Sequence, residues 1–177
     1  VTDRGADALA PDLALLRERA AEAAVIGETG LDKGWRAAPR PIQLQALRGQ
    51  VQLAVALELP LILHCVRSHG ACLSILREEG LRTGGMVHDF CGPPEMIPDW
   101  LDAGFLLSIS PRGMDHDAVT RAIPGEALLL ETDDAGPELL PSVCARLAEA
   151  RGLSPEELAR QTEANARRLF RLGPRRA

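Results

Sequence analysis

The chain has 177 residues, 46% of them hydrophobic, and its 20 basic and 25 acidic side chains give a net charge of −5. This size suits one buried core and is too small for two large ones, so we expect residues 1–177 to form a single domain with flexible segments at 1–10 and 173–177. The acidic balance argues against broad, sequence-independent binding to nucleic-acid backbones, which needs a basic face. It does not exclude a nucleic-acid substrate held through metal ions.

The cysteines and the apolar runs indicate the cellular compartment in which the protein is expected. The four cysteines are scattered and contain no C-x-x-C pair, which is typical of reduced thiols in the cytosol. The first residues show no basic-then-apolar leader, and no run approaches the roughly 18 apolar residues that a membrane span requires. We therefore expect a cytoplasmic protein with no membrane partner.

In chain order, the sequence predicts helices alternating with short apolar strands. The expected strands lie at 24–28, 60–65, 85–88, 105–109 and 128–133. The expected helices lie at 11–24, 42–57 and 71–79, around Ile97 and Leu101, within 112–123, and at 142–151 and 155–172. The last of them opens on the capping-box pattern Ser154-Pro155-Glu156-Glu157. Strands with consecutive apolar residues are typical of a parallel sheet buried on both faces.

The spacing of the strands predicts an α/β fold. Their ends fall near residues 28, 64, 88, 110 and 133, at intervals of 36, 24, 22 and 23 residues, each the length of one strand–helix unit. Five such units suit a partial or open (β/α) barrel, or a doubly wound sheet. Because a closed eight-stranded barrel takes about 250 residues, the chain is too short by the first two or three units of that fold.

Four of the expected strands end on a residue type that binds metals, namely Glu28, His64, His88 and Asp133. Parallel strands bring their carboxyl ends to one edge of the sheet, so these side chains should converge there. Burying two imidazoles and two carboxylates together is costly unless they pair or bind a cation. The pattern therefore indicates either ion pairs within the cluster or a divalent-metal site.

The predicted ligands also suggest the chemistry. Imidazole and carboxylate together suit Zn, Mn or Co, and Mg more weakly. Glu28 can bridge, which allows one or two ions and a water activated for hydrolysis. In this interpretation His64 and His88 hold one ion, Glu28 is shared, and Asp133 is a ligand or the general base. Glu28 and Asp133 are thus the predicted catalytic residues.

Neighbouring residues are weaker candidates. Arg67 is a candidate for binding an anionic substrate oxygen, although a surface position is the commoner one for an arginine. His69 is expected to contact substrate, to support a ligand or to face solvent. Glu131 shares a strand face with Asp133, which suggests a supporting role behind the ligands. Cys65 is expected to pack rather than react.

Several segments together resemble one family. Residues 25–32, which contain Gly-Glu-Thr-Gly-Leu-Asp, resemble the G-E-x-G-L-D signature of the TatD-type metal-dependent deoxyribonucleases. Residues 59–65, 86–90 and 128–133 are similar to its later signatures, and residues 163–170 to its closing helix. The resemblance implies an amidohydrolase-like TIM barrel that hydrolyses phosphodiester bonds, in nucleic acid or a small substrate. By position it also implies a divalent metal on Glu28, His64, His88 and Asp133.

The chain departs from that family at two places. It contains no H-x-H pair, and the opening strands of the barrel are absent. The loop after Asp133 is also compressed. We therefore expect either a fragment of a longer protein or a natural short form, with a homodimer or a compensating strand covering the open sheet edge. The alternative function is a catalytically reduced remnant that serves as a binding or assembly module. A third is another amidohydrolase-like reaction, on a cyclic amide or lactone.

Overall fold

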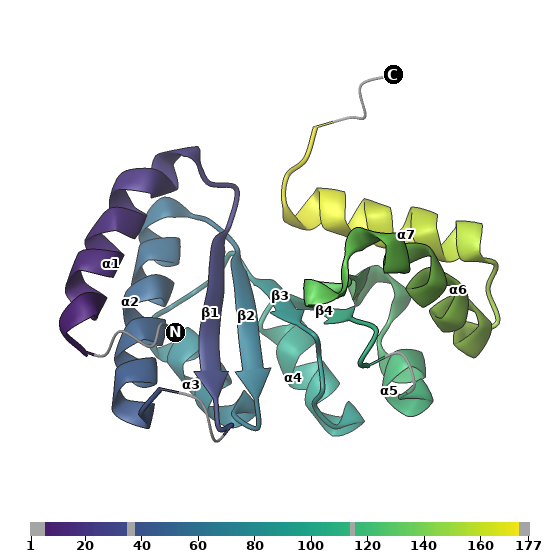
Figure 1. Ribbon diagram of the computed structural model, residues 1–177, viewed down its shortest axis with the longest axis horizontal. Coiled ribbons are helices and arrows are strands. Elements are labelled where there is room, and N and C mark those ends of the chain that lie inside the picture. The colour runs from purple at the N-terminus through teal and green to yellow at the C-terminus, as the bar shows by residue number, and fades with distance from the viewer. Residues whose placement is uncertain (1–5, 35–37, 114–115, 174–177) are drawn as a thin grey trace.

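The computed structural model describes residues 6–34, 38–113 and 116–173 of the chain. Its centre is a sheet of five parallel strands in the order β1-β2-β3-β4-β5, so that β1 and β5 form the two edges (Figure 1). The strands are β1 (Ile26–Asp32), β2 (Leu61–Val66), β3 (Gly85–His88), β4 (Phe105–Ile109) and β5 (Leu128–Leu130). This open sheet confirms the predicted α/β fold with parallel strands.

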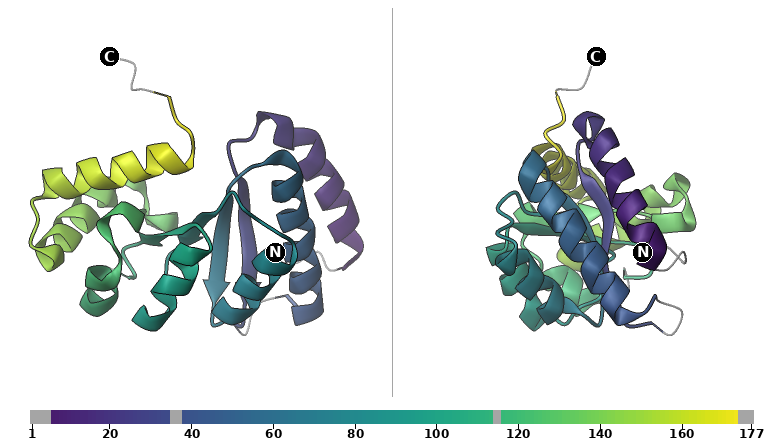
Figure 2. Two further views of the ribbon diagram at one scale, coloured as in Figure 1. Left: turned by 180° about the vertical axis from the view of Figure 1, so that it is seen from behind. Right: turned by 90° about the vertical axis from the view of Figure 1, so that its left-hand side faces the viewer.

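Seven helices accompany the sheet within the described residues. They are α1 (Ala6–Arg19), α2 (Arg40–Leu57), α3 (His69–Glu78), α4 (Ile97–Asp102), α5 (Asp117–Ala122), α6 (Leu140–Arg151) and α7 (Pro155–Leu169). Seen from behind, α2 to α4 lie in front of the sheet (Figure 2), whereas the opposite view shows β1 and β2 uncovered (Figure 1). The helices therefore cover one face of these strands and leave the other face open.

Strand β2 shows how the two faces differ. Leu61, Leu63 and Cys65 are buried under the helices, whereas the alternate residues, which include His64, are half-buried on the open face. The sequence predicted strands buried on both faces. In the described part of the chain the sheet does not close into a barrel, so its inner face keeps contact with solvent. His64 lies on this inner face.

Several boundaries differ from the prediction, and those near the termini and the strand ends matter most here. Residues 6–10, expected to be flexible, begin α1, whereas 1–5 and 174–177 lie outside the described residues. Strand β1 continues through its glycines to Asp32 because Gly30, with φ of 152°, pairs closely with His64; a Cβ there would lie 1.8 Å from the His64 carbonyl oxygen. Strand β5 ends at Leu130, so Asp133 lies in a 3₁₀ turn (Asp133–Ala135) rather than in the strand.

The predicted capping box of α7 is present. The Ser154 hydroxyl accepts a hydrogen bond from the backbone N–H of Glu157, and the Glu157 carboxylate accepts one from the backbone N–H of Ser154 at 2.8 Å. These two bonds satisfy donors that a helix start otherwise leaves unpaired. Helix α7 ends at Leu169, three residues before the predicted end.

Candidate metal centre

The two histidines from the middle of the sheet lie side by side. His64 pairs with His88 in the parallel register of β2 and β3, and both side chains point to the inner face. Their ring centroids are 6.1 Å apart with an angle of 29° between the planes. This neighbour relationship follows from the sequence pattern, because each histidine is at or near the carboxyl end of its strand.

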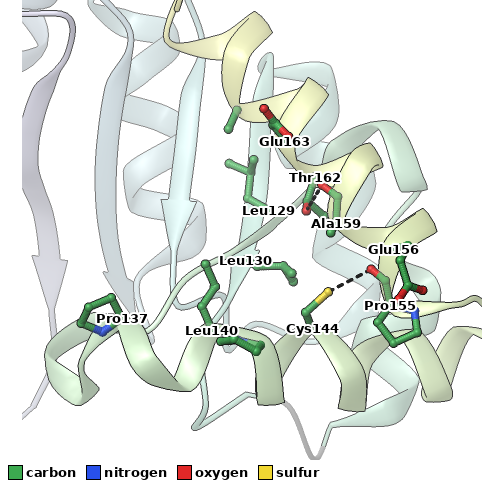
Figure 3. A pocket seen from close by; sticks show the side chains of 12 residues that line it. Leu129, Leu130, Pro137, Leu140, Cys144, Pro155, Glu156, Ala159, Thr162 and Glu163 are labelled. Carbon is green, nitrogen blue, oxygen red and sulfur yellow. Dashed lines mark hydrogen bonds between the residues drawn. The ribbon is translucent and has the colours of Figure 1, made fainter. Parts of the chain in front are cut away.

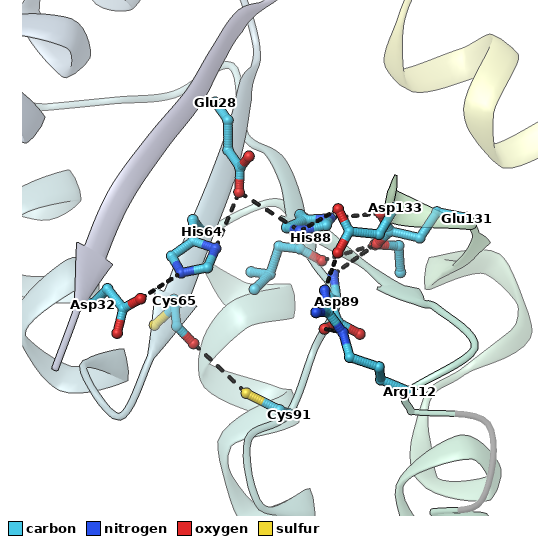
Figure 4. A network of polar contacts seen from close by, with 12 residues as sticks. Glu28, Asp32, His64, Cys65, His88, Asp89, Cys91, Arg112, Glu131 and Asp133 are labelled. Carbon is cyan, nitrogen blue, oxygen red and sulfur yellow. Dashed lines mark hydrogen bonds and ion pairs between the residues drawn. The ribbon is translucent and has the colours of Figure 1, made fainter. Parts of the chain in front are cut away.

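Glu28 reaches both histidines from β1 (Figure 4). Its Oε1 lies 3.0 Å from Nδ1 of His64 and 3.6 Å from Nε2 of His88. One oxygen and two imidazole nitrogens therefore lie within 4.8 Å of one another, a spacing at which they could hold one metal ion. The three side chains range from half-buried to exposed, so the cluster is open to solvent.

Asp133 lies next to this cluster. Its Oδ1 is 3.8 Å from Nε2 of His88, and its Oδ2 forms an ion pair with Arg112. The structure thus places all four predicted ligands together at the carboxyl ends of the strands. Glu28, His64 and His88 lie closest to one another. That each of them binds metal stays a prediction.

Each imidazole is held from behind by a second carboxylate. Nε2 of His64 lies 3.2 Å from Oδ2 of Asp32, and Nδ1 of His88 lies 2.5 Å from Oε2 of Glu131. Such carboxylates fix the ring orientation and the tautomer of metal-binding histidines. The sequence indicated this role for Glu131. It missed Asp32, which the same G-E-T-G-L-D segment contains, because the extension of β1 was not expected.

The backbone of Asp32 is itself fixed. Its N–H donates to Oε1 of Gln43 at 2.7 Å, and Nε2 of Gln43 donates to the Asp32 carbonyl at 2.9 Å. Gln43 is buried on α2. Because buried amides require partners, this reciprocal pair holds the end of β1 in place and, with it, the Asp32 carboxylate that contacts His64.

The protonation states in the cluster depend on these contacts. The hydrogen bond with His64 lowers the pKa of Glu28. The hydrogen bond with Glu28 raises the pKa of His64, and the one with Glu131 raises the pKa of His88. Burial raises the pKa of Glu131, but its hydrogen bonds, first that from His88, lower it overall. These contacts therefore favour the ionised form of Glu28 and Glu131, the form in which carboxylates bind cations.

Carboxylates outnumber positive charges around the cluster. Even with both imidazoles protonated, the cations His64, His88 and Arg112 are fewer than the connected acids Glu28, Asp32, Asp89, Glu131 and Asp133. Ion pairing within the cluster, the alternative interpretation of the sequence, leaves this negative charge incompletely compensated. A divalent cation would compensate it, so the donor set fits a metal.

The predicted substrate residues lie beside the cluster in different settings. Arg67, directly after β2, is exposed. His69, at the start of α3, accepts a hydrogen bond at Nδ1 from Nε1 of Trp100 at 3.1 Å and meets the rings of Phe90 and Trp100 edge-on. The aromatic contacts of His69 favour a packing role over substrate contact. Both substrate roles stay predictions. Cys65 is buried, as expected.

A separate apolar groove of about 670 Å³ lies between β5, α6 and α7 (Figure 3). Leu130, Leu140 and Cys144 are among its lining residues, and the Cys144 thiol donates to the Pro155 carbonyl at 3.3 Å. No member of the histidine–carboxylate cluster lines this groove. The chemistry indicated by the sequence is therefore located at the strand ends and not in the groove.

Comparison with known proteins identifies the family. The family described as TatD related DNase matches residues 3–171. The chain belongs to the TatD family. It is 34% identical to an uncharacterized metal-dependent hydrolase, YabD, of Bacillus subtilis, over 91% of this chain and 71% of that protein. It is 35% identical to the 3'-5' ssDNA/RNA exonuclease TatD of Erwinia billingiae, over 85% of this chain and 67% of that protein.

Solved structures agree with this family membership. The TatD homolog YJJV of Escherichia coli K12 superimposes with a TM-score of 0.83 and 28% identity, covering 97% of this chain and 73% of that one. The predicted class, a TatD-family hydrolase, is confirmed, and the family together with the Glu28–His64–His88 cluster supports a divalent metal. None of the described helices combines the length and apolar character of a membrane span. The cytoplasmic location and the homodimer stay predictions.

Proposed function

We propose that this TatD-family chain hydrolyses phosphodiester bonds in nucleic acid or in a small phosphodiester. The observation that carries the proposal is the approach of Glu28, His64 and His88, whose potential ligand atoms lie within 4.8 Å of one another. The exonuclease name of the 35% identical relative from Erwinia billingiae supports the choice of a single-stranded nucleic acid.

The residues present fit a divalent metal in this position. Nδ1 of His64 and Nε2 of His88 face Glu28, and the other nitrogen of each ring faces Asp32 or Glu131. In each ring, one nitrogen is thus placed to bind the metal and the other contacts a supporting carboxylate, the usual arrangement of metal-binding histidines. Two imidazole nitrogens with carboxylate oxygen favour Zn, Mn or Co over Mg.

The residues around this position can be assigned distinct tasks. When bound, the ion supplies Lewis acidity and makes water a nucleophile near neutral pH. Glu28 orients the site because one of its oxygens contacts both imidazoles. Asp133 has Oδ1 on the side of His88 and Oδ2 on Arg112, so Oδ1 is the atom placed to accept a proton from attacking water.

Metal analysis and a hydrolysis assay together test the proposal. Purified protein is expected to contain a divalent metal and to hydrolyse bis(p-nitrophenyl) phosphate in a reaction that a chelator stops. His64→Ala should remove both the metal and the activity, because it deletes a ligand at the centre of the cluster. Arg48→Gln is the matched control, since Arg48 pairs with Glu78 and Glu79 on the surface, away from the cluster.

A binding or assembly module is the second candidate. Two observations favour it: the sequence has no H-x-H pair, and within the described residues the sheet is open at β1 and β5. The same experiment separates the two functions. Protein that is metal-free and inert, with His64→Ala behaving like the wild type, would support the module and contradict the hydrolase.

A further inference from the structure

Arg112 lies at the rim of the candidate metal centre, in the segment that follows β4. Its Nε is 3.1 Å from Oδ2 of Asp89, and its Nη2 pairs with Oδ2 of Asp133 (Figure 4). The Arg112 side chain is 68% exposed, against 21% for Asp89 and 25% for Asp133. The guanidinium therefore covers two carboxylates from the solvent side.

Hydrogen bonds hold Asp89, the carboxylate that contacts Arg112, in place. The Ser110 hydroxyl donates to Oδ1 of Asp89 and accepts from the backbone N–H of Arg112 at 3.1 Å. The backbone N–H of Asp89 donates to Oε1 of Glu131, the carboxylate behind His88, at 2.6 Å. Arg112 is thus connected to the metal centre through hydrogen-bonded groups that directly follow β3, β4 and β5.

Among the described residues, the partners of the Arg112 guanidinium use only part of its donors. A guanidinium has five N–H donors in a planar fork, and the contacts with Asp89 and Asp133 use only Nε and Nη2. Asp133 bridges the two parts of the site, since its Oδ1 lies 3.8 Å from Nε2 of His88. An anion bound by the remaining donors would therefore be separated from His88 only by the carboxylate of Asp133.

Charge gives Arg112 a particular importance. The acids of the cluster repel an approaching phosphate, and among the described ion pairs Arg112 is the one arginine or lysine that contacts any of them. Arg67 is exposed nearby but takes part in none of those pairs. Arginine also matches phosphate geometry better than lysine because it can bind two oxygens at once.

We propose that Arg112 binds a non-bridging phosphate oxygen of the substrate and so makes the site selective for an anionic phosphodiester over a neutral ester. This inference rests on the proposed hydrolase function and adds a substrate-binding residue that the sequence pattern did not indicate. It assigns to Arg112 a contact with the substrate in addition to its contact with Asp133.

The proposed phosphate contact of Arg112 is tested by the binding of two short fluorescein-labelled thymidine oligonucleotides. One has hydrolysis-resistant anionic phosphorothioate linkages, and the other has neutral methylphosphonate linkages. Fluorescence anisotropy is measured with Mn²⁺ present, and bound metal is measured for every variant. The wild type should bind the anionic strand about tenfold or more tightly than the neutral one, as for one charged hydrogen bond. Arg112→Gln should lose most of this preference, and its log–log salt slope should become shallower by about 0.7.

Two variants complete the design. Arg112→Lys should retain part of the preference because it keeps the charge but loses the fork. Arg48→Gln, which also breaks an arginine bridge between two carboxylates, should behave as the wild type. The proposal is overturned if the wild type shows no preference for the anionic strand, if Arg112→Gln keeps it, or if that variant loses it only together with bound metal.

A separate assay distinguishes this inference from the function on which it rests. If the wild type hydrolyses bis(p-nitrophenyl) phosphate while Arg112→Gln keeps the preference for the anionic strand, the Arg112 site is wrong and the hydrolase stands. If the wild type is inert but Arg112→Gln still loses the preference, the hydrolase is wrong and the phosphate contact stands.

Discussion

Asp32 contacts His64 on the side of the imidazole opposite Glu28. The distance from Asp32 Oδ2 to His64 Nε2 is 3.2 Å, and that from Glu28 Oε1 to His64 Nδ1 is 3.0 Å. Glu28 therefore lies at the potential metal position together with His64, and Asp32 fixes the orientation of the His64 ring. A mutation of Asp32 should weaken metal binding without removing a ligand.

We expect Asp32→Asn to lower metal affinity by about 10- to 100-fold, the usual effect of losing a carboxylate behind a metal-binding histidine. Competition with a chromophoric chelator measures this loss, and circular dichroism checks that the fold is kept. Asp102→Asn, an exposed acid on α4, is the matched control and should bind metal normally. Equal affinities for the two variants would show that Asp32 does not support His64.

Glu131→Gln should affect both metal binding and stability. Glu131 contacts Nδ1 of His88 through one oxygen, and its other oxygen accepts from the Asp89 amide and the Ser108 hydroxyl. An amide can accept only through its single oxygen, so one buried partner loses its bond, at a cost of about 1–3 kcal/mol in the free energy of unfolding.

Urea denaturation and metal titration separate the two effects of Glu131→Gln. Ser108→Ala is a useful comparison because it removes a hydroxyl that bonds Glu131 but leaves the contact with His88 intact. Ser108→Ala should therefore lose stability and retain most of its metal affinity. An equal loss of metal affinity in both variants would mean that the His88 contact is not what matters.

The sequence predicted the array of Glu28, His64 and His88 for a simple geometric reason. Consecutive parallel strands are adjacent in this sheet, and their carboxyl ends lie on the same side of it. The convergence of residues at those ends can therefore be predicted without knowing the structure of the loops. The same reasoning placed Asp133 nearby. It did not show that β5 ends at Leu130 and that a 3₁₀ turn carries Asp133.

The contacts that the sequence did not predict depend on irregular backbone. Asp32 reaches His64 because β1 continues past Gly30, and Arg112 reaches Asp133 from a segment between β4 and α5. Neither contact follows from a period of hydrophobic residues, which is the main signal for secondary structure. Side chains on such segments have to be located in three dimensions.

Metal binding should stabilise the fold. A ligand that binds only the native state raises the free energy of unfolding by about 2.7 kcal/mol at a concentration one hundred times its dissociation constant. Glu28, His64 and His88 come from three strands, so the array of ligands exists only in the folded chain. Thermal unfolding monitored by circular dichroism should therefore shift upward when Zn²⁺ or Mn²⁺ is added.

His64→Ala provides the control for this shift, because it retains the strands but removes the central ligand. Its melting temperature should not respond to added metal, whereas Arg48→Gln should respond as the wild type. A metal-induced shift of the same size in His64→Ala would locate the stabilising ion elsewhere.

Gly30 should be intolerant of a side chain. Its φ of 152° is rare for other residues, and a Cβ at this position would lie 1.8 Å from the carbonyl oxygen of His64. Gly30→Ala must therefore push β1 away from β2, and we expect it to lower the free energy of unfolding by about 3 kcal/mol or more. Glu28 and Asp32 flank this position on β1, so metal binding should fall as well.

Gly70→Ala is the matched substitution. Gly70 lies inside α3, and a Cβ there would meet no atom within 4 Å. Because alanine restricts the unfolded chain and favours the helix, Gly70→Ala should be neutral or should stabilise the protein by about 0.4–1 kcal/mol. Chemical denaturation of both variants gives the comparison. If Gly30→Ala were as stable as Gly70→Ala and bound metal normally, the close pairing of β1 with β2 could not be what positions Glu28 and Asp32 around His64.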